Sequence, residues 1–95
     1  MQISINEARL REELNTLAGF THAEPVTNGT AVTRIVFSDD DLHARAWLKS
    51  LAAEAGFSVR EDAVGNTFIR WEGLESELAP VATGSHIDAI PNAGA

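Results

Sequence analysis

The sequence has no cysteine in its 95 residues, so disulfide bonds and thiolate metal sites are excluded. Basic residues are also few: seven Lys and Arg stand against fourteen Asp and Glu, which gives a net charge of −7. Nucleic acids and anionic membrane surfaces both select basic patches. We therefore expect no nucleic-acid partner and no membrane partner.

Long hydrophobic runs are missing as well, and none approaches the length of a membrane span. The N-terminus lacks the basic start and apolar core of a secretory signal, so a cytoplasmic location is expected. Apolar residues make up 44% of the chain and charged residues 22%, which is ordinary for a globular protein. The length predicts one small domain over residues 1–95, burying roughly 60–65% of its unfolded surface.

Two segments carry helical patterns. A capping box at Ser4 and Glu7 predicts a helix over residues 4–18, closed by Gly19, with leucines on one stripe at Leu10, Leu14 and Leu17. A second helix is predicted to begin after Ser38 as N-cap, with a hydrophobic staple between Phe37 and Leu42, and to end at Gly56 and Phe57. Its buried stripe is Ala44, Leu48, Leu51, Ala52 and Ala55.

The second helix starts with three aspartates, residues 39–41. Carboxylates in a first turn complement the helix dipole, and this explains all three without a metal or acid–base role, which is the alternative. His22 has no partner at metal-ligand spacing, and His43 lies on the polar side of the helix. Both histidines are predicted to be exposed.

The remaining regular structure is extended. A short extended piece is predicted in residues 31–37. Alternating patterns predict strands in residues 57–62 and 67–71, joined by a turn at Gly65-Asn66. In that turn Asn66 is expected to tolerate a positive φ. From Pro80 the chain resembles a strand buried on both faces. Two helices and about three strands in this order predict an α/β fold.

That last strand is predicted to lead into Gly84-Ser85-His86-Ile87-Asp88. His86 and Asp88 are two positions apart, so in an extended segment both side chains point to the same side. An imidazole beside a carboxylate at the end of a buried strand is a common way to build metal and acid–base sites, and ligands collect at the carboxyl ends of strands in open α/β sheets. Judged on spacing alone, a structural or surface pair is the alternative.

The whole run Thr83-Gly84-Ser85-His86-Ile87-Asp88-Ala89-Ile90-Pro91-Asn92-Ala93-Gly94 resembles the first metal-ligand motif of the amidohydrolases that cleave allantoate, ureidoglycolate and N-carbamoyl-L-amino acids. These enzymes belong to the dinuclear metallo-exopeptidase and aminoacylase superfamily. Thr33, Arg34 and Ser38 match a further part of the pattern. Asp62 followed by Gly65-Asn66 and an apolar strand matches another. For Arg34, a solvated surface position is what the sequence alone favours.

The resemblance implies that His86 ligates the first of two divalent ions, manganese or zinc, with nickel or cobalt as alternatives. Asp88 would be the catalytic-site carboxylate that orients this imidazole. The family's bridging aspartate in an Asp-Gly, its Glu-Glu pair and a further histidine have no counterpart in residues 1–95. The chain is accordingly identified as an N-terminal portion of a zinc-exopeptidase-like α/β catalytic domain, without the rest of that domain or the lid and dimerisation domain.

The implied activity is metal-dependent hydrolysis of C–N bonds in ureides, ureidoglycolate or allantoate, in purine catabolism. The Ala-Ile-Pro-Asn-Ala-Gly run at residues 89–94 favours this branch. The alternatives are an N-carbamoyl-L-amino acid hydrolase and a non-catalytic small binding domain. The implied partner is a small-molecule ureide or carbamoyl amino acid substrate, and the full-length enzyme would be a homodimer. The chain alone is expected to be inactive.

Overall fold

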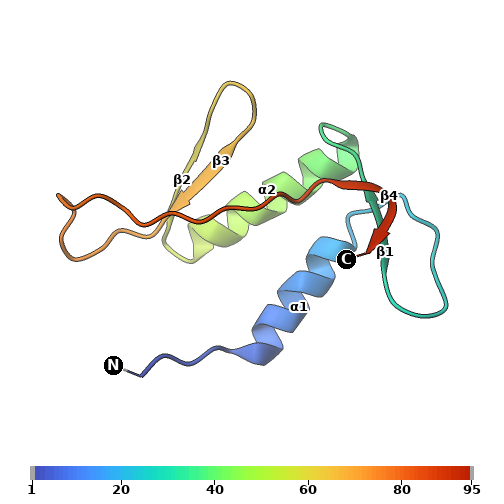
Figure 1. Cartoon of the computed structure of the whole chain (residues 1–95), viewed down its shortest axis with the longest axis horizontal. Helices are drawn as coiled ribbons and strands as arrows, with labels where there is room; N and C mark the ends of the chain where they lie inside the picture. Colours follow the sequence, from blue (N-terminus) through green and yellow to red (C-terminus); the bar gives the residue numbers. More distant parts are fainter. Residues whose placement is uncertain (1, 95) are drawn as a thin grey trace. The chain divides into compact units, whose positions relative to one another are not determined.

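The computed structural model describes residues 2–94, which form two helices and four strands. In chain order these are α1 (Glu7–Ala18), β1 (Ala31–Arg34), α2 (Asp39–Glu54), β2 (Ser58–Glu61), β3 (Thr67–Arg70) and β4 (Ala89–Gly94) (Figure 1). The predicted α/β class with two helices is confirmed, with four strands instead of about three. Neither of the described helices is long and apolar enough to cross a membrane.

The chain divides into two compact units. The first unit comprises residues 2–44 together with 87–94 of the described chain, and the second comprises residues 45–86. Helix α2 contributes its first residues to the first unit and its remainder to the second. Each unit holds one two-stranded antiparallel sheet, β1 with β4 and β2 with β3.

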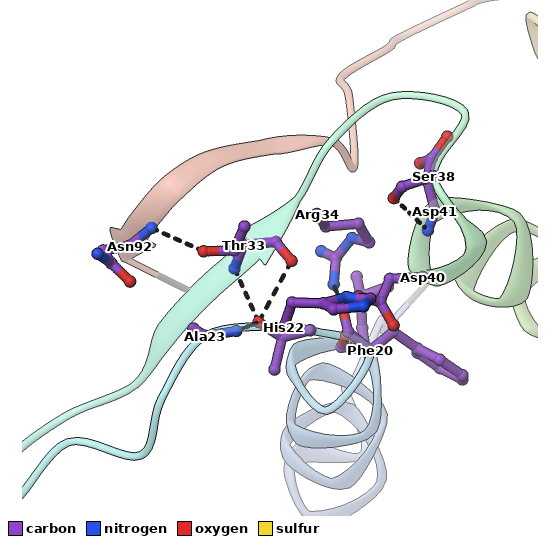
Figure 2. A network of polar contacts seen from close by, with 11 residues as sticks. Phe20, His22, Ala23, Thr33, Arg34, Ser38, Asp40, Asp41 and Asn92 are labelled. Carbon is purple, nitrogen blue, oxygen red and sulfur yellow. Dashed lines mark hydrogen bonds and ion pairs between the residues drawn. The ribbon is translucent and has the colours of Figure 1, made fainter.

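Strand β1 is the centre of the first unit. On one side it pairs with β4, and the Thr33 hydroxyl accepts a hydrogen bond of 2.9 Å from the backbone N–H of Asn92 (Figure 2). On the other side the backbone N–H of Thr33 donates to the hydroxyl of Thr21 at 2.7 Å. Val32 between these contacts is 1% exposed. The strand therefore lies between β4 and the segment that contains Thr21.

Helix α1 begins later than predicted. Its N-cap is Asn6, whose side-chain oxygen accepts a hydrogen bond of 3.1 Å from the backbone N–H of Arg9. The Ser4 capping box is therefore wrong, because Asn6 is an equally good cap and lies directly before the first helical residue. None of the described residues of α1 is buried, so its leucine stripe is only partly covered.

Helix α2 has the ends that its sequence predicted. At its start the Ser38 hydroxyl accepts the backbone N–H of Asp41 at 3.3 Å. At its end Gly56 has φ 85°, its N–H donates to Ala53 O at 3.0 Å, and Phe57 N–H donates to Ala52 O at 3.0 Å. This pair of bonds is a Schellman motif. Phe37 and Leu42, the two residues of the predicted staple, are 59% and 49% exposed, and the contact between them stays a prediction.

The second unit contains the predicted hairpin. Strand β2 pairs with β3 in the register Ser58 opposite Arg70 and Glu61 opposite Thr67. In the turn, Gly65 has the positive φ, 90°, and Asn66 does not, so the conformation expected of Asn66 is wrong. Glycine takes that position because it has no Cβ to clash.

The strand predicted from Pro80 is not formed. Residues 80–88 lie outside helices and strands, Val81 is 101% exposed, and the fourth strand begins only at Ala89. A strand needs a hydrogen-bonded neighbour, and no described segment pairs with these residues. The buried apolar side chains of the described chain are few: Val32, Ala44 and Ala52.

Candidate functional site

The two residues singled out by the motif lie just before β4. His86 is exposed, and Asp88 is half-buried at the residue preceding the first strand position, Ala89. Because residues 84–88 are not in a strand, projection of both side chains to one side stays a prediction. The sequence motif therefore places an imidazole and a carboxylate at the entry to the strand that pairs with β1.

Arg34, at the end of β1, is buried, with 5% of its surface exposed. Its Nε donates to the backbone carbonyl of Ile87 at 2.7 Å. Its Nη1 donates to the carbonyls of Leu17 and Phe20, each at 2.8 Å (Figure 2). The prediction of a solvated Arg34 is therefore wrong: the side chain joins the C-terminal end of α1 to the residue between His86 and Asp88.

The charge of Arg34 is compensated by its surroundings. Burial lowers the pKa of the guanidinium, and the carboxylates of Asp41 and Asp88 oppose that shift by favouring its charged form. The acceptor carbonyls are that of Leu17 in the last turn of α1 and that of Phe20 just after the helix, and a cation is also favoured at a helix C-terminus. A buried cation is tolerated here because it is both hydrogen-bonded and surrounded by negative charge. Two sequence signals pointed to this position: an arginine within a mostly apolar extended segment, and the match of Thr33, Arg34 and Ser38 to the family pattern.

The aspartates at the start of α2 have structural roles. Asp41 is fully buried, and its Oδ2 accepts the backbone N–H of Phe37 at 2.8 Å. Phe37 has a left-handed φ of 63°, which this contact helps to hold. The side chain of Asp40 forms an ion pair with Nδ1 of His22 when that histidine is protonated (Figure 2). The helix-start explanation of these carboxylates is supported.

The other two histidines are exposed as predicted. The His22 side chain is 70% exposed in spite of its contact with Asp40, and His43 is exposed on α2. Neither is near enough to other donors to complete a metal site among the described residues. The metal role of His86 rests on the family resemblance of residues 83–94 and stays a prediction.

The turn in the second unit is organised by Asp62. Its carboxylate accepts hydrogen bonds from the backbone N–H of Val64 at 3.1 Å, from the backbone N–H of Asn66 at 2.8 Å and from the side-chain amide of Asn66 at 2.8 Å. These bonds, the Asn66 side-chain bond first, lower the pKa of Asp62. The Asp-x-x-Gly-Asn part of the pattern therefore builds a turn, which accounts for these residues without a catalytic role.

The donors present do not make a metal site by themselves. A catalytic metal needs about three protein ligands and an open position. Within residues 2–94 no group of three or more His, Cys, Asp and Glu side chains could hold an ion. An imidazole and a carboxylate are chemically suitable donors for zinc or manganese, so His86 and Asp88 fit part of such a site and cannot complete it.

Comparison with known proteins gives strong similarities, although no protein-family model matches the chain. Ureidoglycolate hydrolase from Arabidopsis thaliana is 47% identical over 92 residues, 97% of this chain and 18% of that protein. An N-carbamoyl-L-amino-acid amidohydrolase from Paenarthrobacter aurescens is 37% identical over 86 residues, 90% of this chain and 20% of that protein. Allantoate amidohydrolase from Bacillus subtilis is 36% identical over 63 residues, 66% of this chain and 15% of that protein.

The fold agrees with these similarities. A crystal structure of AtUAH in complex with glyoxylate superposes with a TM-score of 0.83 at 48% identity, covering 94% of this chain and 20% of that chain. The chain thus spans about one-fifth of the length of the relatives that it matches. The resemblance drawn from the motif of residues 83–94 is confirmed.

Proposed function

We propose that this chain, a homologue of the ureidoglycolate, allantoate and N-carbamoyl-L-amino acid amidohydrolases, is the N-terminal portion of the catalytic domain of a metal-dependent amidohydrolase. Its reaction would be hydrolysis of a C–N bond in a ureide. The observation that carries this proposal is the 47% identity to a ureidoglycolate hydrolase over 97% of this chain.

The substrate class follows from the relative strength of the similarities. Identity to the two ureidoglycolate hydrolases from Arabidopsis thaliana and Oryza sativa is 47% and 49%, against 37% for the carbamoylase and 36% for the allantoate enzyme described above. We therefore place ureidoglycolate first and keep carbamoyl amino acids as the second candidate. The Paenarthrobacter similarity over 90% of this chain is what favours that second candidate.

In this proposal His86 contributes one imidazole to a divalent metal, manganese or zinc, and Asp88 holds that imidazole in the tautomer that a metal requires. A metal ion in such a site polarises the scissile carbonyl and supplies an activated water. The chain's own part is to present these two side chains before β4. The remaining ligands, the general base and a homodimeric assembly in the cytoplasm belong to the longer enzyme that we propose.

The test is hydrolysis of ureidoglycolate, allantoate and an N-carbamoyl amino acid by the protein of the complete reading frame. Wild-type protein loaded with manganese or zinc is expected to prefer a ureide. His86→Ala is expected to lose most of the bound metal and the turnover. The matched control is His43→Ala, which removes an exposed histidine on α2. Equal metal content and turnover in the His86 and His43 variants would contradict the proposal.

A further inference from the structure

Resting on the proposed function, we infer that Arg34 is a positioning residue for that site. Its guanidinium holds the carbonyl of Ile87, the residue between His86 and Asp88, at 2.7 Å. The function of this contact is to fix the backbone from which the two side chains project. Arg34 touches neither substrate nor metal in this role: it holds the Ile87 carbonyl, and its positive charge also attracts the Asp88 carboxylate.

The first support is that the Arg34 side chain is itself held firmly in place. Arg34 is 5% exposed and makes three hydrogen bonds of 2.7–2.8 Å, all from a charged donor to a backbone carbonyl. Bonds of this kind are about twice as strong as neutral ones. Two of them reach Leu17 in the last turn of α1 and Phe20 just after the helix, so the guanidinium is itself held by the end of the helix and the residues that follow it.

The second support is the position of the Arg34–Ile87 contact, just before the start of β4. Arg34 lies opposite Ala89 in the β1–β4 pair, so the strand ladder begins one residue after Asp88. The residues just before Ala89 lie outside helices and strands. The hydrogen bond from Arg34 Nε to the Ile87 carbonyl therefore connects β1 to a residue that the strand pairing does not reach. The Nε contact fixes the backbone at Ile87, ahead of the first ladder residue of β4.

The third support is that lysine could not replace the contact. A guanidinium holds Nε and Nη1 at different edges of one rigid plane, which allows simultaneous bonds to Ile87 and to the carbonyls of Leu17 and Phe20. A lysine ammonium is a point donor and reaches one of the two sides. Arg34→Lys therefore keeps the buried charge and releases one set of acceptors, which separates positioning from charge.

The experiment compares Arg34→Lys with Arg45→Lys in the protein of the complete reading frame. Arg45 is the matched control, because its Nη1 also donates to a backbone carbonyl, that of Gly65 in the second unit. Two quantities are measured: the metal dissociation constant by chelator competition, and deuterium uptake of peptides covering residues 84–89. We expect Arg34→Lys to raise both the dissociation constant and the uptake rate about tenfold, and Arg45→Lys to change neither.

A measurement on the wild-type protein keeps the test independent of any variant's folding. In ¹⁵N-arginine-labelled protein, the Nε–H of Arg34 is expected to exchange at least tenfold more slowly than that of Arg9, whose side chain is 72% exposed. Equal exchange rates, or an unchanged metal constant in a folded Arg34→Lys protein, would overturn the inference. A wild-type protein without metal binding or turnover instead contradicts the proposed function, and with it the site that Arg34 would position.

Discussion

Replacing Asp41 by alanine tests how the start of α2 is held. Asp41 is fully buried, and its carboxylate accepts the N–H of Phe37 at 2.8 Å while its own N–H donates to the Ser38 hydroxyl. It also adds negative charge near the buried Arg34. Asp41→Ala removes the acceptor and that charge but leaves the helix sequence otherwise intact, so the change in free energy of unfolding reports on these contacts.

The magnitude follows from the contacts that are lost. A hydrogen bond to a charged acceptor is worth about 1.5–3 kcal/mol, and loss of a carboxylate beside a buried cation adds to this. Release of Phe37 from its left-handed φ of 63° returns about 1 kcal/mol. The expected net loss is about 2–3 kcal/mol. Asp39→Ala, at an exposed first-turn position, removes only a helix-dipole contribution of about 0.3–1 kcal/mol.

The assay is urea unfolding of the 95-residue chain followed by far-UV circular dichroism, with sucrose present so that weakened variants stay folded at zero urea. The midpoint of Asp41→Ala is expected to fall well below that of Asp39→Ala. Asp41→Asn keeps an acceptor oxygen and should lie between them. Equal midpoints for the two alanine variants would refute the reasoning, because the buried carboxylate would then contribute no more than an exposed one.

Three further predictions concern activity, pH and backbone conformation. The 95-residue chain with manganese or zinc should hydrolyse no ureide above a metal-only control, because residues 2–94 hold no group of three metal donors; turnover that vanishes in His86→Ala would contradict this. The lowered pKa of Asp62 contributes stability that is present above its ordinary value of 3.8 and is lost as the pH falls through the lower folded value. Asp62→Asn should therefore be less stable than the wild type at pH 7 and should lose less stability on acidification. Urea midpoints measured across the acid range test this. A urea midpoint that depends on pH in the same way in both proteins would argue against a stabilising role of Asp62 in the turn. Gly56→Ala should cost about 1 kcal/mol, since Gly56 has φ 85° and open space around it. Gly73→Ala, with open space and no positive φ, should cost much less in the same unfolding assay, and equal losses would count against a conformational cause.

The parts of the fold that could be predicted depend on neighbours in sequence. The ends of α2 follow from Ser38 and from Gly56 with Phe57, whose hydrogen bonds close within five residues. The β2–β3 hairpin follows from alternating patterns on either side of a five-residue turn, residues 62–66, which Asp62 stabilises. Contacts between neighbours in sequence determine these elements, so the sequence alone was enough to predict them.

The parts that could not be predicted depend on distant segments. Burial of Arg34 needs carbonyls from two stretches that are distant from it in the chain, one with Leu17 and Phe20 and the other with Ile87. Composition cannot show that these stretches converge, so a surface position was the reasonable expectation. The apolar run from Pro80 failed as a strand for the related reason that pairing requires a partner strand, and none is supplied by residues 2–94.

The sequence predicted the family motif of the candidate site, but the roles of its residues stay proposals. The identity of its motif was readable from residues 83–94, and the similarity to ureidoglycolate hydrolases confirms that resemblance. The roles of His86 as a metal ligand and of Asp88 as its orienting carboxylate are proposals, because residues 2–94 form no group of three or more side chains that could hold a metal ion. What the structure adds is Arg34, whose contact with Ile87 connects the motif to β1 and α1.

The most direct test of the metal-hydrolase proposal is the sequence of the reading frame beyond Ala95. An Asp-Gly within about five residues, followed further on by a Glu-Glu pair, is the predicted result. It would supply the bridging carboxylate, a metal ligand and the general base that a two-metal hydrolase needs beside His86. A stop codon directly after Ala95 is the contradicting result. It would leave His86 and Asp88 without the remaining ligands, and the enzyme assignment would fall.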